Sequence, residues 1–256
     1  MKRILAAALL AVSVAAWACA GDRPGSPSDV SEHPSLKLTT AHFQLFADRI
    51  DQAALNLVAG LLEANYPRIT SDLGVAGLPV TSVWLWQDRA SFYADMQAHA
   101  GRVYAGSGGY VRGRNAVSVL AAAGAGAAAE AAVHEFAHVV SMAVNPAIPN
   151  NPRWLWETVA LYENRELVDP RTLAYMQAGR YPSLADLDAA YDSSGGRQVY
   201  EVGYVLGEFI VGTWGANGLI RLIQRNGDVQ AALGLTVAAF ESRWHAFLHA
   251  EYGLPA

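Results

Sequence analysis

The sequence predicts an α+β fold in which a small N-terminal β-sheet with helices is followed by a mainly helical C-terminal half. Two observations support this class. Runs rich in β-branched and aromatic residues lie before residue 121, and helical spacing of apolar residues dominates after it. The 256 residues are 52% apolar and 16% charged, which excludes disorder over most of the chain and allows a large core.

The first half of the predicted fold holds short strands and one amphipathic helix. The helix covers residues 53–73 and is closed by Gly74, which follows the last apolar position. We assign residues 37–126 to this β-rich half of a single domain. Strands are expected at 38–46, 79–86, 109–111 and 116–120, and a polar turn joins the last two.

The second half, residues 127–256, is predicted to be helical. Asn145-Pro146 ends its first helix, and the second stops before Pro170. The expected helices cover residues 127–144, 154–166, 198–214, 218–224 and 240–252. The first of them connects the β-rich half to the helical half.

The N-terminus is typical of an export signal. Lys2 and Arg3 precede an uncharged run that is too short for a comfortable membrane span, so residues 1–18 are predicted to be a signal peptide. Cleavage after Ala20 would remove the only cysteine. Alternatively, Ala16-Trp17-Ala18-Cys19 resembles a bacterial lipobox and makes Cys19 the lipidated first residue, although Leu is usual where Ala16 stands and a small residue where Trp17 stands.

A Gly/Pro/Ser-rich stretch follows the signal. Residues 19–36 contain little to bury and are expected to form a flexible tether, which favours the lipid-anchored form. We therefore expect an exported protein of the bacterial cell envelope, periplasmic or at the cell surface, that contacts the membrane only through lipid on Cys19. The oligomeric state is not predicted.

Composition excludes two kinds of site. The net charge of −5 provides no basic footprint for nucleic acid. A single cysteine excludes both a disulfide framework and a metal site built mainly from thiolates.

One motif carries metal chemistry. His134-Glu135-Phe136-Ala137-His138 lies inside the predicted helix 127–144, where residues four apart share one face, so both imidazoles can bind one ion. Neutral imidazole is a good zinc ligand, and Glu135 can act as general base on a water bound to that metal.

A catalytic zinc site needs a third protein ligand and one open position. Glu157, separated from His138 by eighteen residues, is the candidate. The loop 145–152 is rich in proline and asparagine and must turn the chain, so the next helix can return and direct Glu157 toward the histidines. We expect one Zn²⁺, although such ligands also accept other divalent ions.

These residues resemble the gluzincin metallopeptidases. The pattern His134-Glu135-x-x-His138, eighteen residues, then Glu157 within Trp154–Glu163 (WLWETVALYE) is similar to the family's W-L-x-E-G-x-A-x-Y-x-E. The closer likeness is to compact bacterial peptidase MA-like domains, with aminopeptidase N as a larger relative. The resemblance implies a zincin-like fold and zinc-dependent hydrolysis of peptide bonds in a peptide or protein substrate.

The same resemblance suggests further site residues. Val199-Tyr200-Glu201-Val202-Gly203 is similar to the V-Y-E-K-G segment of aminopeptidases, which implies that Tyr200 donates to the oxyanion of the transition state. The run 109–120 resembles the zincin strand whose edge pairs with an extended substrate, which implies substrate contacts at Gly109, Ala116 and Val117.

Two departures from the family pattern matter. Thr158 replaces the usual glycine after the third ligand, which crowds a helix contact but removes no ligand. The G-x-M-E-N segment that holds a substrate amino terminus is absent, since Gly108–Arg112 (GGYVR) offers no such carboxylate. An endopeptidase, or a peptidase with another end-group selectivity, is therefore favoured over an aminopeptidase.

Other interpretations stay open for the motif. The four residues could form a buried polar cluster, or the chain could be a non-catalytic, metal-containing peptidase-like module that binds peptide or cell-wall material. A hydrolase of non-peptide amides is a third alternative. Tyr200 could simply be a core residue with its hydroxyl satisfied.

The remaining patterns are interpreted as structural. Glu163 and Glu166 are expected to be exposed helix charges, and His245 and His249 to lie on a solvated helix flank. The run 124–129 imitates a dinucleotide fingerprint but lacks the acidic residue about 20 positions on. Gly106-Ser107-Gly108 lacks the first glycine of a nucleophile elbow.

Overall fold

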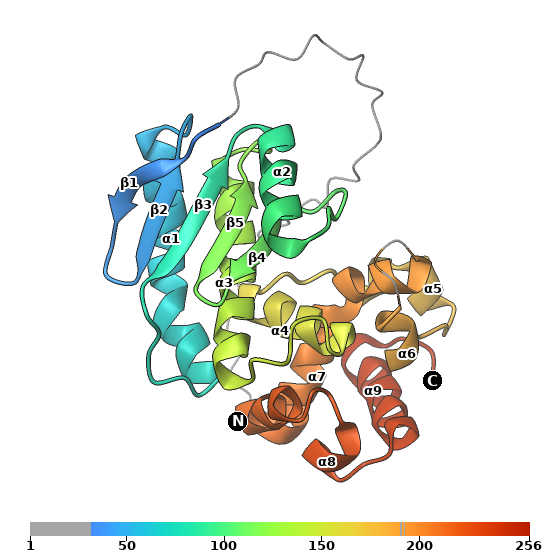
Figure 1. Cartoon of the computed structure of the whole chain (residues 1–256). Helices are drawn as coiled ribbons and strands as arrows, with labels where there is room; N and C mark the ends of the chain where they lie inside the picture. The colour runs from blue at the N-terminus through green and yellow to red at the C-terminus, as the bar shows by residue number, and fades with distance from the viewer. Residues whose placement is uncertain (1–31, 190, 192) are drawn as a thin grey trace, which may run out of the picture. The chain divides into compact units, whose positions relative to one another are not determined.

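A five-stranded sheet opens the computed structural model of the chain, which describes residues 32–189, 191 and 193–256 (Figure 1). Its order is β1-β2-β3-β5-β4, in which β2, β3 and β5 are parallel and the edge strands β1 and β4 are antiparallel to their neighbours. The strands are β1 (Ser35–Thr39), β2 (Phe43–Ala47), β3 (Thr81–Trp86), β4 (Gly109–Gly113) and β5 (Ala116–Leu120).

The fold begins within the predicted tether (residues 19–36), because β1 starts at Ser35. Glu32 is buried, and its carboxylate accepts hydrogen bonds from the backbone N–H groups of Gln87 and Asp88, both at 2.9 Å. The single strand predicted at 38–46 is in fact two strands, β1 and β2, because the chain turns between Thr39 and Phe43. The predicted signal peptide, Cys19 and the first part of the tether lie outside the described residues.

Helices cover both faces of the sheet. The strand residues that alternate toward one face, such as Phe43, Leu45 and Val117, are buried in the main core beneath α1 (Gln52–Asp72) and α3 (Ala125–Val144). On the other face, α2 (Arg89–Ala100) packs Phe92 and Met96 against the sheet in a smaller core. The sequence-based prediction missed α2.

The second half of the described chain is helical, as expected (Figure 1). Its long helix α7 joins two predicted helices and is interrupted by non-helical backbone at Gly215, with φ 68° and ψ 178°. None of the described helices combines the length and apolar character needed to cross a membrane. The elements are α4 (Arg153–Asn164), the 3-10 turn η1 (Pro170–Thr172), α5 (Ala174–Gln177), α6 (Leu184–Leu187), α7 (Ser194–Gln224), α8 (Val229–Leu233) and α9 (Val237–Tyr252).

Helix α4 is enclosed on almost every side, and this corrects one prediction. Glu163, expected to be exposed, is fully buried because the C-terminal end of α4 lies against α1. Its carboxylate accepts a hydrogen bond from Arg68 Nη1 of α1 at 2.6 Å, and Arg68 Nη2 donates to the backbone carbonyl of Glu163. The pair fixes the end of α4 to α1.

The contact between α4 and α7 is close because glycines face the larger side chains of α4. A Cβ built on Gly203 would lie 3.4 Å from the Cα of Thr158, and one built on Gly207 would lie 2.6 Å from the Cβ of Tyr162. The extra bulk of Thr158 is therefore accommodated by Gly203 on the opposing helix.

Candidate metal centre

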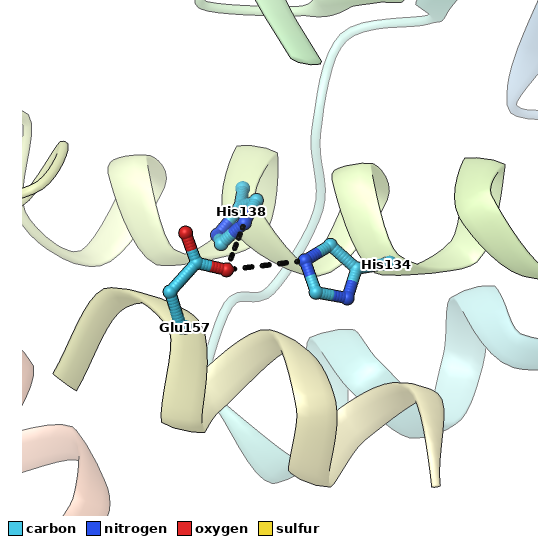
Figure 2. A group of neighbouring side chains, drawn as sticks. All are labelled: His134, His138 and Glu157. Carbon is cyan, nitrogen blue, oxygen red and sulfur yellow. Dashed lines mark ion pairs between the residues drawn. The ribbon is translucent and has the colours of Figure 1, made fainter. Parts of the chain in front are cut away.

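Helix α3 presents its two histidines toward α4. The helix is rich in alanine, the best helix former, and His134 and His138 lie one turn apart on one face. Their ring centroids are 4.9 Å apart, and the ring planes are nearly perpendicular at 83°. Figure 2 shows both rings on the side of α3 that faces Glu157.

Helix α4 brings the predicted third ligand to the histidines (Figure 2). Glu157 Oε2 lies 3.4 Å from His134 Nε2 and 3.8 Å from His138 Nε2. One ligand atom from each of the three residues lies within 4.8 Å of the other two. In a tetrahedral site with bonds of about 2.1 Å, ligand atoms are about 3.4 Å apart, so both nitrogen–oxygen distances suit a common ion.

The environment of the second histidine also suits a metal. His138 is 2% exposed and stacks on Trp156, with ring centroids 3.8 Å apart and planes 6° from parallel. Burial, and then the positive charge of His134, lower the pKa of His138 well below its ordinary value. His138 is therefore a neutral imidazole, which is the form that binds metal ions. The residues present fit a divalent cation.

Glu166 is a site residue that sequence reasoning missed. Its Oε1 lies 3.0 Å from His134 Nδ1 and also accepts a hydrogen bond from Asn164. Glu166 is exposed, as predicted, but it is not a free surface charge. It follows Arg165, whose left-handed backbone (φ 60°) ends α4, and that turn is not evident from the spacing of residues.

The carboxylates around His134 change its titration. Burial by itself would lower the pKa of His134, but the charges and hydrogen bonds of Glu166 and Glu157 outweigh burial and raise that pKa well above its ordinary value. Burial likewise tends to raise the pKa of Glu166, yet His134 and Asn164 lower it overall. His134 thus lies between two carboxylates, one on each ring nitrogen.

Glu135 lies between the ligands and the sheet. Its side chain packs directly on Gly109 of β4, where an added Cβ would be 2.8 Å from Glu135 Cγ. Burial raises the pKa of Glu135 to about 8, with His134 opposing and Glu157 adding to the rise. A carboxyl group whose pKa is near neutrality can both accept and return a proton.

Tyr200 also reaches the site. Its hydroxyl, carried by α7, donates a hydrogen bond to Glu157 Oε1 at 3.1 Å. Burial and then the charge of Glu157 raise the pKa of Tyr200 well above its ordinary value, so its hydroxyl stays protonated. The structure therefore brings all five of the predicted metal and catalytic residues together.

Only one of the three predicted substrate contacts lies on a sheet edge. Gly109 belongs to the edge strand β4, as expected. Ala116 and Val117 belong to β5, which pairs with β3 on one side and β4 on the other. The backbone of β5 is therefore engaged within the sheet, and an edge contact at Ala116 and Val117 was a wrong expectation.

The second histidine pair of the sequence does not form a comparable cluster. His245 and His249 lie on α9, and His249 Nδ1 is 2.7 Å from the carbonyl oxygen of Leu254. Among the described residues, His134, His138 and Glu157 alone form a group of three potential metal ligands.

Comparison with known proteins adds no relative: no protein-family model matches the chain, and no curated protein matches it in sequence.

Proposed function

We propose that the chain is a divalent-metal-dependent peptidase of the gluzincin type, most simply a zinc enzyme. The observation that carries the proposal is the convergence of His134, His138 and Glu157 beside the buried carboxyl of Glu135. A merely structural polar cluster does not require an acid next to the first histidine, whereas hydrolysis requires a proton acceptor at that position.

The three ligands would hold the ion, which when bound supplies Lewis-acid chemistry by polarising an acyl oxygen and favouring ionisation of water. Glu135 accepts the proton of the attacking water and returns it to the leaving amine. Its side chain is held in place by contact with Gly109. Glu166 orients His134 through Nδ1, which leaves Nε2 directed at the site.

Tyr200 is proposed to stabilise negative charge that develops on the acyl oxygen. Its hydroxyl is protonated and lies at the site, since it already contacts Glu157. The outer side of β4 is proposed to pair with an extended peptide, because backbone groups on a sheet edge can bind a further strand. Gly109 places this edge next to Glu135.

The decisive experiment replaces Glu135 by glutamine, which keeps the shape of the side chain but removes the proton acceptor. We expect cleavage of an unstructured protein substrate to fall at least about 100-fold while one metal ion per chain stays bound. Glu130→Gln is the matched control, since Glu130 is an exposed residue of the same helix. Proteolysis by Glu135→Gln at the wild-type rate would refute the mechanism.

Chelator-sensitive cleavage separates the peptidase from the alternative binding module, because both would hold one metal ion. One bound ion together with chelator-sensitive cleavage supports the enzyme. One bound ion with no cleavage of any broad peptide library supports a non-catalytic, metal-containing module that binds peptide or cell-wall material.

We further propose that the protein is exported to the bacterial cell envelope and anchored by lipid on Cys19. The basic and apolar N-terminus followed by a lone cysteine supports this. Intact-mass measurement should find a diacylated Cys19, and an N-terminus at Gly21 would exclude the anchor.

A further inference from the structure

Arg153, the first residue of α4, carries a buried guanidinium that forms no ion pair with an acidic side chain among the described residues; Asp188 accepts a hydrogen bond from its backbone N–H at 2.6 Å instead. The residue is 8% exposed. Its Nη1 donates to the backbone carbonyls of Ala189 at 3.1 Å and Gly196 at 2.6 Å. Its Nη2 is buried and has no hydrogen-bond partner among the described residues.

The other enclosed arginines of the described chain do have acidic partners. Arg68 lies 2.6 Å from the carboxylate of Glu163, and Arg112 lies 2.9 Å from that of Asp95. Buried charges are usually paired, because desolvation is costly unless an opposite charge compensates for it. Arg153 differs from them, because no acidic side chain among the described residues compensates for its charge.

This guanidinium lies at the candidate metal centre. Arg153 and Glu157 are one turn apart on α4, and Tyr200 contacts both residues: its hydroxyl donates to Glu157, and its ring centre is 5.4 Å from the guanidinium carbon. The ring of Tyr191 is also 5.4 Å from that carbon. An anion on Nη2 would thus lie beside these two tyrosines, within one helical turn of Glu157.

We propose that Arg153 Nη2 binds a carboxylate of the substrate, an inference that rests on the proposed peptidase function. A guanidinium matches the planar geometry and charge of a carboxylate. Because Nη2 is screened from solvent, a carboxylate reaches it only when the side chains that cover it move aside. The bound carboxylate is then desolvated beside the rings of Tyr191 and Tyr200, which strengthens the pairing. The anion is either the C-terminal carboxylate of a peptide or an Asp or Glu side chain.

The selectivity inferred here complements a feature of the sequence. The segment Gly108–Arg112 lacks an acid that would hold a substrate amino terminus, whereas Arg153 supplies a cation for the opposite kind of group. The site is therefore expected to select substrates by negative charge.

The test measures binding to zinc-loaded Glu135→Gln protein, in which turnover does not interfere. Three probes are compared by calorimetry: N-acetyl-trialanine with a free carboxylate, the same peptide as its C-terminal amide, and the amide with glutamate as its middle residue. We expect one of the two anionic probes to bind about 10-fold more tightly than the neutral amide. Whichever anionic probe gains identifies the source of the carboxylate.

Two substitutions at Arg153, made in the Glu135→Gln protein, show whether Arg153 causes the preference for an anionic probe. Arg153→Met should abolish it. Arg153→Lys keeps a cation that can donate to the carbonyls of Ala189 and Gly196 but lacks a second terminal nitrogen, so the preference should fall while the thermal unfolding temperature is kept. Arg197→Met is the matched control, since Arg197 is an exposed arginine of α7, and it should leave the preference unchanged.

The outcomes separate this inference from the proposed function. Equal binding of all three probes, or a preference that survives both Arg153 substitutions, overturns the inference even if the wild-type protein cleaves peptides. A carboxylate preference that depends on Arg153, in a wild-type protein that cleaves nothing, upholds the binding role and refutes the peptidase.

Discussion

His134 is bound from both sides by acids. Its Nε2 lies 3.4 Å from Glu157 and its Nδ1 lies 3.0 Å from Glu166, so each ring nitrogen has a distinct partner. With Nδ1–H donated to Glu166, Nε2 is the nitrogen that would release its proton on binding an ion, and the ring cannot rotate without losing a hydrogen bond. Glu166 is thus a positioning residue for His134.

Replacing Glu166 by glutamine should weaken zinc binding by roughly 10-fold or more, because the amide orients His134 less firmly and no longer increases its basicity. Competition with a chromogenic chelator measures this affinity. Glu130→Gln, on the exposed side of α3, should bind zinc like the wild type. Unchanged affinity in Glu166→Gln would show that the contact does not support the ligand.

Glu163 should make stability depend on pH. Burial raises its pKa to about 7, and Arg68 only partly opposes that rise. The folded protein therefore holds a proton between about pH 4.5 and 7 that the unfolded chain has released, and the stability gained from this proton is lost as the pH rises through 7.

The free energy of unfolding of the wild type, taken relative to that of Glu163→Gln, is expected to be about 1–3 kcal/mol larger at pH 5 than at pH 7. Urea unfolding of the wild type and of Glu163→Gln at both pH values measures it: the stability of the wild type relative to the variant should be greater at pH 5. Equal differences at the two pH values would show that Glu163 is ionised throughout this range.

Individual residues were predictable where the chemistry is local. His134, Glu135 and His138 share one helix, so their relative positions follow from its geometry, and Glu157 follows from a short turning loop. The burial of Glu163 was not predictable from the sequence. The spacing of residues gives the side of α4 on which Glu163 lies, but not which other elements cover that side. The role proposed for Arg153 could not be predicted from the sequence, because it depends on a buried guanidinium nitrogen that lacks a hydrogen-bond partner among the described residues.

At the scale of elements, the position of Tyr200 depends on how closely α7 approaches α4. Gly207 faces Tyr162, and a Cβ there would lie 2.8 Å from Cγ of that ring as well as 2.6 Å from its Cβ. These atoms are close to the α4 backbone and cannot swing aside. Any side chain at Gly207 therefore forces the two helices apart.

Gly207→Ala should destabilise the protein by about 1–3 kcal/mol through this overlap. Gly212→Ala is the matched control on α7: it is exposed, has open space where the Cβ would go, and should be neutral or stabilising by up to about 1 kcal/mol. Chemical unfolding measures both. Equal effects of the two substitutions would mean that the α4–α7 contact tolerates extra volume.

Elements were predicted well where periodicity is strong. The helix 127–144 and the hairpin strands agree with α3, β4 and β5 within about two residues. Helix α2 was missed because only Phe92 and Met96 mark its buried apolar side, although Asp88 and Gly101 cap its ends. The division between β1 and β2 depends on a turn without the usual glycine or proline signal.

For the whole molecule, the candidate metal site connects the two halves of the described chain. Its histidines lie on α3, which packs on the sheet, and Glu157 lies on α4 in the helical half. An ion held by all three residues binds the folded state far better than the unfolded chain and so adds to stability.

Chelation should therefore lower the unfolding temperature. With free zinc at 1,000 times its Kd, the metal-bound protein gains about 4 kcal/mol, which for a domain of this size corresponds to roughly 10 °C. Thermal unfolding with zinc and with a chelator measures the shift. His138→Ala should show almost none, and an equal shift in that variant would place the binding site elsewhere.

The position of β4 at the edge of the sheet, where the hydroxyl of Ser107 occupies the backbone groups of Gly109, has a consequence for behaviour at high concentration. Unpaired backbone groups on an edge strand bind any extended chain, including the same strand of a second copy, which is a route to aggregation. β4 has only five residues, its register with β5 shifts between Val111 and Gly113, and it ends in glycine. Because β4 is short and irregular, only a few backbone hydrogen bonds can form between the edges of two copies. The same edge can still pair with a peptide of a few residues.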